Sequence, residues 1–141
     1  ERAEALPAVL AREQSFGTRV AATKGVVRAT GYRAGQTLVL TTTVSNDQSA
    51  AAHALRAAGA DVAFVFSERE PGTWVVGRGD PGALHLPEDV FDPLVDRFGG
   101  DGGGHAGAGV AKVESTALED VREATLSAVE AALDGTLTEL S

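Results

Sequence analysis

Two stretches of the sequence, TLVLTTT at residues 37–43 and DVAFVF at residues 61–66, decide the fold class. The first is rich in β-branched residues, which favours a strand. The second is an almost continuous apolar run, typical of a strand that is buried on both faces. Between them, residues 50–58 have a helical composition, and Gly59 follows as a helix stop. Strand, helix and strand in this order predict a βαβ unit, to which a strand at 73–78 adds a hairpin.

The rest of the chain predicts further elements around this unit. Residues 19–29 alternate loosely around Lys24-Gly25, which predicts a second hairpin. Val110 to Glu114 predicts a short strand, and apolar residues at helical spacing over 117–133 predict an amphipathic helix that packs on a sheet. The expected fold is α/β, with a mixed β-sheet of about five strands, helices packed on it, and a single domain.

The first residues predict a separate element. Leu6, Val9 and Leu10 stand among charged residues, which predicts a short amphipathic helix over 1–14. The sequence begins with Glu1 and contains no Met, so we expect a piece of a longer protein. Residues 1–14 would then be a linker helix from a missing upstream domain, and 15–141 would form the domain itself.

The charge and composition limit the classes of function. Twenty Asp and Glu against twelve Lys and Arg give a net charge of −8, which argues against long-range attraction of nucleic acid. Any phosphate site must therefore be local. The absence of Cys excludes disulfides and thiolate metal sites. An acidic, Lys-poor, Ala-rich chain is typical of salt-loving microbes, and the alternative is an acidic protein from a GC-rich genome.

The unusual feature is GGDGGGHAGAG at residues 99–109, in which seven of eleven positions are glycine. Ordering so many glycines is entropically costly, and one reason for it would be a loop whose bare amides curl around an anion. The alternative is a flexible connector. The tract matches G-x-G-x-x-G only formally, because a helix precedes it and a strand follows it, the reverse of a dinucleotide-binding turn. No Gly-Lys-Ser/Thr triplet exists for a phosphate-binding P-loop.

Two side chains could assist such a loop. His105, inside the tract, could donate to a phosphate oxygen, or it could bond only to the backbone. Arg78 ends a predicted strand between two glycines and could hold a phosphate with two hydrogen bonds, or form a surface ion pair with Asp80. The three histidines stand at no metal-ligand spacing, so we expect no metal site built by this chain alone.

The string RFGGDGGGHAGAG at residues 97–109 resembles the signature of the DHH-family phosphoesterases, and more narrowly that of their C-terminal DHH-associated domain. The order of elements around it is also similar, with an apolar strand at 60–65 followed by a strand that carries Arg78. The likeness covers residues 36–114 best. Together with the composition, it suggests a halophilic archaeon as the source.

This resemblance implies a mixed α/β substrate-binding domain over 15–141 with a glycine-rich loop at 99–109. The implied substrate ligands are Arg78, Gly102, Gly103, Gly104 and His105. The implied substrate contains phosphate: single-stranded nucleic acid, a short oligonucleotide, a dinucleotide or polyphosphate. The implied partner is an N-terminal domain of the same protein that holds two divalent cations, usually manganese, so no cofactor is expected in this chain.

The Asp-His-His metal motif of that family is absent from this sequence, which predicts that the chain binds substrate but does not cleave it. A cytoplasmic location, no membrane partner and a possible homodimer are also expected. Two other hypotheses stay open: a non-catalytic regulatory module that binds a nucleotide or phosphate, and a structural dimerisation domain. The loop hypothesis further predicts that Gly104→Val blocks the anion site while leaving the fold intact.

Overall fold

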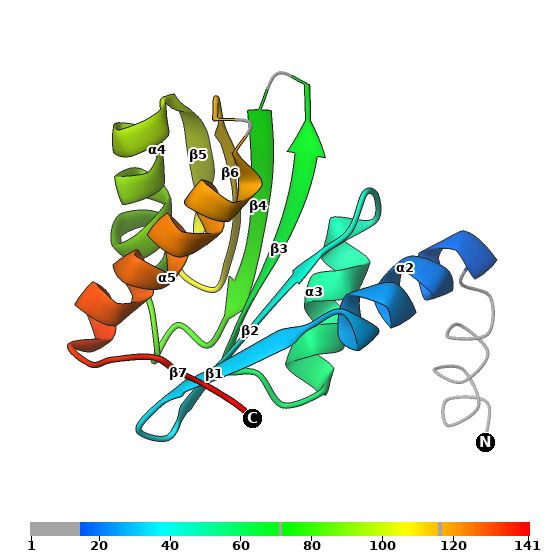
Figure 1. Ribbon diagram of the computed structural model, residues 1–141, viewed down its shortest axis with the longest axis horizontal. Coiled ribbons are helices and arrows are strands. Elements are labelled where there is room, and N and C mark those ends of the chain that lie inside the picture. The colour runs from blue at the N-terminus through cyan, green and yellow to red at the C-terminus, as the bar shows by residue number, and fades with distance from the viewer. Residues whose placement is uncertain (1–14, 71, 116) are drawn as a thin grey trace.

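The computed structural model describes residues 15–70, 72–115 and 117–141 as one α/β domain (Figure 1). The strands are β1 (Thr30–Ala34), β2 (Thr37–Thr43), β3 (Val62–Arg69), β4 (Gly72–Gly79), β5 (Gly100–His105), β6 (Ala108–Val113) and β7 (Thr138–Glu139). The helices are α2 (Phe16–Val27), α3 (Gln48–Ala57), α4 (Asp92–Phe98) and α5 (Leu118–Leu133), and a π-helical turn, η1 (Pro87–Phe91), leads directly into α4.

The strands form one mixed sheet in the order β5-β6-β4-β3-β2-β1-β7. Strands β2 and β3 are parallel and joined through α3, which confirms the predicted βαβ unit. The other neighbouring strands are antiparallel. The α/β class and the single domain are therefore confirmed, but the sheet has seven strands rather than about five. The additional strands are β5, from the glycine tract, and β1 and β7 at the opposite edge of the sheet. The side chains of these segments did not predict strands.

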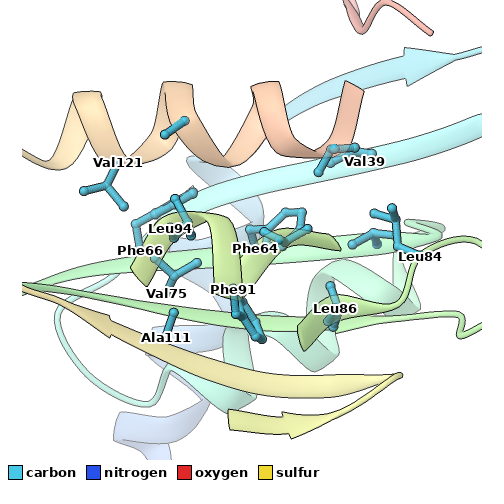
Figure 2. Packing of buried hydrophobic residues seen from close by; sticks show 14 of the residues in the cluster. Val39, Phe64, Phe66, Val75, Leu84, Leu86, Phe91, Leu94, Ala111 and Val121 are labelled. Carbon is cyan, nitrogen blue, oxygen red and sulfur yellow. The ribbon is translucent and has the colours of Figure 1, made fainter. Parts of the chain in front are cut away.

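Strand β3 is buried on both faces, as its apolar sequence predicted. Its residues alternate between two clusters: Phe64 and Phe66 face η1, α4 and α5, whereas Ala63 and Val65 face α3. Figure 2 shows the first cluster, in which the Phe91 side chain lies close to the strands that carry Phe64 and Val75. All three of these side chains are at most 1% exposed, so this cluster fixes the sheet against the carboxyl-terminal helices.

The predicted hairpin at 19–29 is wrong, because this segment forms most of helix α2. The Ser15 hydroxyl accepts a hydrogen bond from the Thr18 N–H at 3.1 Å and caps the helix. Gly25, which suggested a turn, is instead buried where α2 packs on α3. A Cβ on Gly25 would lie 2.9 Å from the Ala51 Cβ, so the glycine allows close helix contact rather than chain reversal.

We expect Gly25→Val to lower the free energy of unfolding by about 1–3 kcal/mol, because the larger side chain must push α2 away from α3. Gly17→Ala is the matched control, since Gly17 lies in the same helix and nothing stands within 4 Å of its added Cβ. That control should raise stability by up to about 1 kcal/mol through helix propensity. Urea unfolding measures both, and equal effects would argue against the α2–α3 contact.

The linker helix predicted at 1–14 lies outside the described residues. Among the residues that are described, no helix combines the length and the apolar character needed to cross a membrane.

Candidate functional site

Strand register brings Arg78 and His105 to one face of the sheet. Arg78 on β4 is paired with Ala108 on β6, and Ala108 is paired in turn with His105 on β5. Residues directly opposite each other on neighbouring strands point to the same face. With strands about 4.8 Å apart, the backbones of Arg78 and His105 are separated by roughly 10 Å. Two residues that are far apart in sequence can therefore contact one small ligand.

The Arg78 guanidinium has no hydrogen-bond partner for its buried Nε atom within the part of the chain that the structure describes. The predicted alternative, an ion pair with Asp80, is not formed. The Asp80 carboxylate instead accepts the N–H of Gly82 at 2.9 Å. A buried donor without a partner costs about 1–3 kcal/mol. The Nε itself is not accessible, so a ligand oxygen can reach only the terminal N–H groups of Arg78.

Arg78 lines a shallow hollow between β4, β6 and the start of α3. Its volume is about 150 Å³, below the usual range of roughly 300–1,000 Å³ for sites that enclose a whole small molecule. A group of phosphate size suits it better. The hollow is lined by Ser49, Val76, Gly77, Arg78, Ala108, Gly109 and Val110.

His105 keeps one ring nitrogen free for a ligand. Its side chain is exposed, and its Nδ1 accepts a hydrogen bond from the Gly107 N–H at 3.3 Å. In the neutral ring, Nδ1 is then the acceptor, so the proton is on Nε2. An Nε2–H group can donate to an anion that lies beside Arg78.

The glycine tract is not a loop. Residues 100–105 form strand β5 at the edge of the sheet, paired along their whole length with β6. The predicted nest of converging amides over 102–105 is therefore wrong in its geometry. A paired edge strand still leaves the polar groups on its outer side without partners, but they lie in a row along the edge.

The three predicted glycine ligands have different surroundings. A Cβ on Gly102 would lie 3.4 Å from both Phe91 and Val95, on the face of η1 and α4. A Cβ on Gly104, whose φ is +134°, would overlap the Ala108 carbonyl oxygen. Gly103 alone has nothing within 4 Å of an added Cβ. It is paired with Val110, a residue of the hollow, but none of the predicted β5 ligands lines the hollow itself: Gly102, Gly103, Gly104 and His105.

The fold of this chain recurs in solved structures, although no protein-family model and no curated protein matches its sequence. It is similar to a DHH-domain protein described as a member of a family of ribosomal proteins. That match has 14% identity and a TM-score of 0.59, and it covers 85% of this chain and 31% of that one. An exopolyphosphatase-related protein from Bacteroides fragilis is also similar, with 12% identity and a TM-score of 0.57 over 87% of this chain and 37% of that one.

The chain has a fold found in DHH-domain proteins. A pGpG-specific phosphodiesterase, PggH from Vibrio cholerae, is similar with 13% identity and a TM-score of 0.50, over 82% of this chain and 39% of that one. This chain thus spans between about a third and two fifths of these three DHH-type proteins.

A second kind of neighbour matches almost in full. The C-Ala domain of the Aquifex aeolicus alanyl-tRNA synthetase has 17% identity and a TM-score of 0.55, and the match covers 73% of this chain and 97% of that domain. The fold therefore occurs both within DHH-type proteins and as a unit of a tRNA synthetase.

A second polar hollow, of about 170 Å³, lies at the carboxyl end of β2. Two arginines, Arg28 and Arg122, line it, and Arg122 already has protein partners: the Tyr32 hydroxyl at 2.6 Å and the Glu119 carboxylate at 3.4 Å. Arg78 has a buried Nε without a partner among the described residues and shares a row of the sheet with His105, and these two observations favour its hollow as the candidate for an anion. Within residues 15–70, 72–115 and 117–141, no three His, Asp or Glu side chains gather as a metal centre would require.

Sequence reasoning missed the rest of the hollow. Ser49 lies at the start of α3, far from the glycine tract in sequence, and nothing in its local pattern indicates a site. Ala108 lies in the glycine tract and Val110 directly follows it, but only their pairing with β4 places them in the lining of the hollow.

Proposed function

We propose that this chain is the substrate-recognition domain of a DHH-type phosphoesterase, and that it holds a substrate phosphate in the hollow at Arg78. The observation that carries the proposal is a half-buried arginine whose Nε has no partner among the described residues, on the same row of the sheet as a histidine with a free Nε2. The DHH-type neighbours support this choice, because this fold occurs in proteins named as a phosphodiesterase and as exopolyphosphatase-related.

Phosphate suits these groups chemically. An arginine guanidinium can give a phosphate two parallel hydrogen bonds, and each charged hydrogen bond contributes about 1.5–3 kcal/mol. The His105 Nε2–H can supply a third donor from β5. Gly103 lies two residues before His105 on the same face of β5, and the open space there leaves room for the anion beside His105. The domain would thus bind and orient the phosphate and offset its charge.

Hydrolysis belongs, in this proposal, to a separate N-terminal domain that binds two divalent cations, with manganese the expected metal. The described residues of this chain contain no group of ligands that fits such a pair. This chain alone is therefore proposed to bind substrate without cleaving it.

Ligand binding should stabilise the domain measurably. At 100 times its dissociation constant, a phosphate-containing ligand should add about 2.7 kcal/mol of stability, which raises the melting temperature by roughly 8 °C for a domain of this size. Pyrophosphate, a dinucleotide and a hexanucleotide should each be tested by thermal unfolding. Sulfate at the same ionic strength separates specific binding from general salt effects.

The same experiment separates the other hypotheses. A structural dimerisation domain should show no specific stabilisation by any of these ligands, which would contradict the proposal. A regulatory module should bind a ligand but gain no hydrolase activity when it is joined to the proposed N-terminal metal-binding domain. Metal-dependent hydrolysis by the joined protein is the expected result.

A further inference from the structure

The face of the sheet that carries Arg78 continues to a tryptophan. Trp74 precedes Arg78 by four residues on β4, so both side chains lie on the same face, about 13 Å apart along the strand. Trp74 is half-buried and is the only tryptophan in the sequence. It is paired with Ser67 on β3 and Lys112 on β6, so it lies on an inner strand and not at an edge of the sheet.

Two cations lie against the Trp74 ring. The Lys112 Nζ is 4.3 Å from the ring centroid, and the Arg69 guanidinium carbon is 5.2 Å from it. Arg69 also has a buried Nε atom without a hydrogen-bond partner among the described residues. The two arginines with such unpaired atoms, Arg69 and Arg78, thus lie on the same face of the sheet, on either side of Val76, which is buried in the cluster under α3.

This surface is basic in an acidic molecule. The strand residues that share the face of Arg78 on β3, β4, β5 and β6 include three cations, Arg69, Arg78 and Lys112. They include one carboxylate, Asp101, which is paired with Lys112. The whole chain has the opposite balance, with 12 Lys and Arg against 20 Asp and Glu. Among these strand residues the cations outnumber the carboxylates, although Glu114 follows β6 directly, and this balance suits an anionic partner.

We propose that Trp74 is a base-stacking subsite, with Arg69 and Lys112 as ligands of the neighbouring phosphates, and that the substrate is a single-stranded oligonucleotide. This inference rests on the proposed function, in which the hollow at Arg78 holds one phosphate of the same molecule. Cationic groups combined with an aromatic platform are the usual means of holding single-stranded nucleic acid. At about 3.4 Å per stacked nucleotide, the roughly 13 Å between the two subsites corresponds to about four nucleotides.

The tryptophan distinguishes this substrate from polyphosphate. The face of an aromatic ring carries partial negative charge, so it attracts cations and offers nothing to a bare phosphate chain. A nucleobase can stack on it through its own π-face. A base that stacks on Trp74 must displace Lys112, whose side chain is exposed. The displaced ammonium can then bind the adjacent phosphate, because a charged hydrogen bond is stronger than an exposed cation–π contact.

The fluorescence of Trp74 tests this subsite directly, because no other tryptophan contributes to it. Hexathymidylate should quench the fluorescence with a saturable curve. An abasic hexamer of the same charge and tripolyphosphate should bind with little quenching. Binding of hexathymidylate without quenching, in wild-type protein, would overturn the inference.

Substitution provides the second test. Trp74→Leu should weaken hexathymidylate binding by about 5- to 150-fold, the range for loss of one stacked base, and leave tripolyphosphate binding unchanged. Trp74→Phe, which keeps a ring, should lose less. Lys112→Ala should also weaken binding, whereas Lys24→Ala, the other lysine of the chain, should not.

These results separate the two proposals. If Arg78→Ala abolishes binding but Trp74→Leu and Trp74→Phe match the wild type, the stacking subsite is wrong and the phosphate site stands. If neither hexathymidylate nor tripolyphosphate binds the wild type, the proposed function itself fails. Thermal unfolding of each variant, without ligand, shows whether an affinity loss reflects the site or the fold.

Discussion

Arg78→Ala is expected to weaken the binding of hexathymidylate by about 10- to 150-fold, the equivalent of the 1.5–3 kcal/mol contributed by a charged hydrogen bond. The reason is that Arg78 has a buried Nε without a partner among the described residues and lines the hollow proposed to hold the phosphate. Tripolyphosphate should lose affinity by a similar factor, because both ligands place a phosphate there. Fluorescence anisotropy of labelled ligands measures both losses.

A matched arginine separates a local effect from a general loss of positive charge. Arg33 is exposed on β1, toward the opposite edge of the sheet, and Arg33→Ala removes the same charge far from the hollow. It should change affinity by less than twofold at moderate salt. If Arg78→Ala also falls below twofold, Arg78 does not belong to the site. The free energy of unfolding of the Arg78→Ala protein should not fall, because Arg78 forms no ion pair in the described structure and its buried Nε lacks a partner there.

Gly104→Val is expected to lower the free energy of unfolding by roughly 2–6 kcal/mol, from backbone strain and overpacking together. Gly104 has a φ of +134°, and an added Cβ would overlap the Ala108 carbonyl oxygen and lie 2.5 Å from the Gly109 Cα. This corrects the sequence-based expectation that the substitution spares the fold. The glycine is needed because two backbones approach closely, a contact that a strand pairing creates and a loop would not.

Gly103→Ala is the control for that prediction. Gly103 has no positive φ and no atom within 4 Å of an added Cβ, so the fold can accept a methyl group. Its stability should stay within about 1 kcal/mol of the wild type, as for a compatible Gly→Ala change. Urea unfolding of both variants gives the comparison, and a loss as large as that of Gly104→Val would contradict the assigned geometry of β5.

Local patterns predicted the centre of the fold correctly. The β-branched run of β2, the apolar run of β3 and the helix between them each follow from their own side chains, so the βαβ unit could be predicted without knowledge of neighbours. The amphipathic spacing of α5 was equally clear. Segment 19–29 was not, because its apolar residues fit two periods, and the helix is favoured by the Ser15 cap and by the close contact of Gly25 with Ala51.

The sequence by itself determined the α/β class, the buried central strand and the presence of Arg78 and His105 as candidate phosphate ligands. Only the tertiary structure decided that the glycine tract is a strand, because glycine carries no side-chain periodicity from which a strand could be predicted. It also decided that Arg78, Ala108 and His105 share one row and that Trp74 and Lys112 face the same way. The reason is that successive side chains of a strand point to opposite faces, so a slip of one position in the pairing would have turned each of these side chains to the other face.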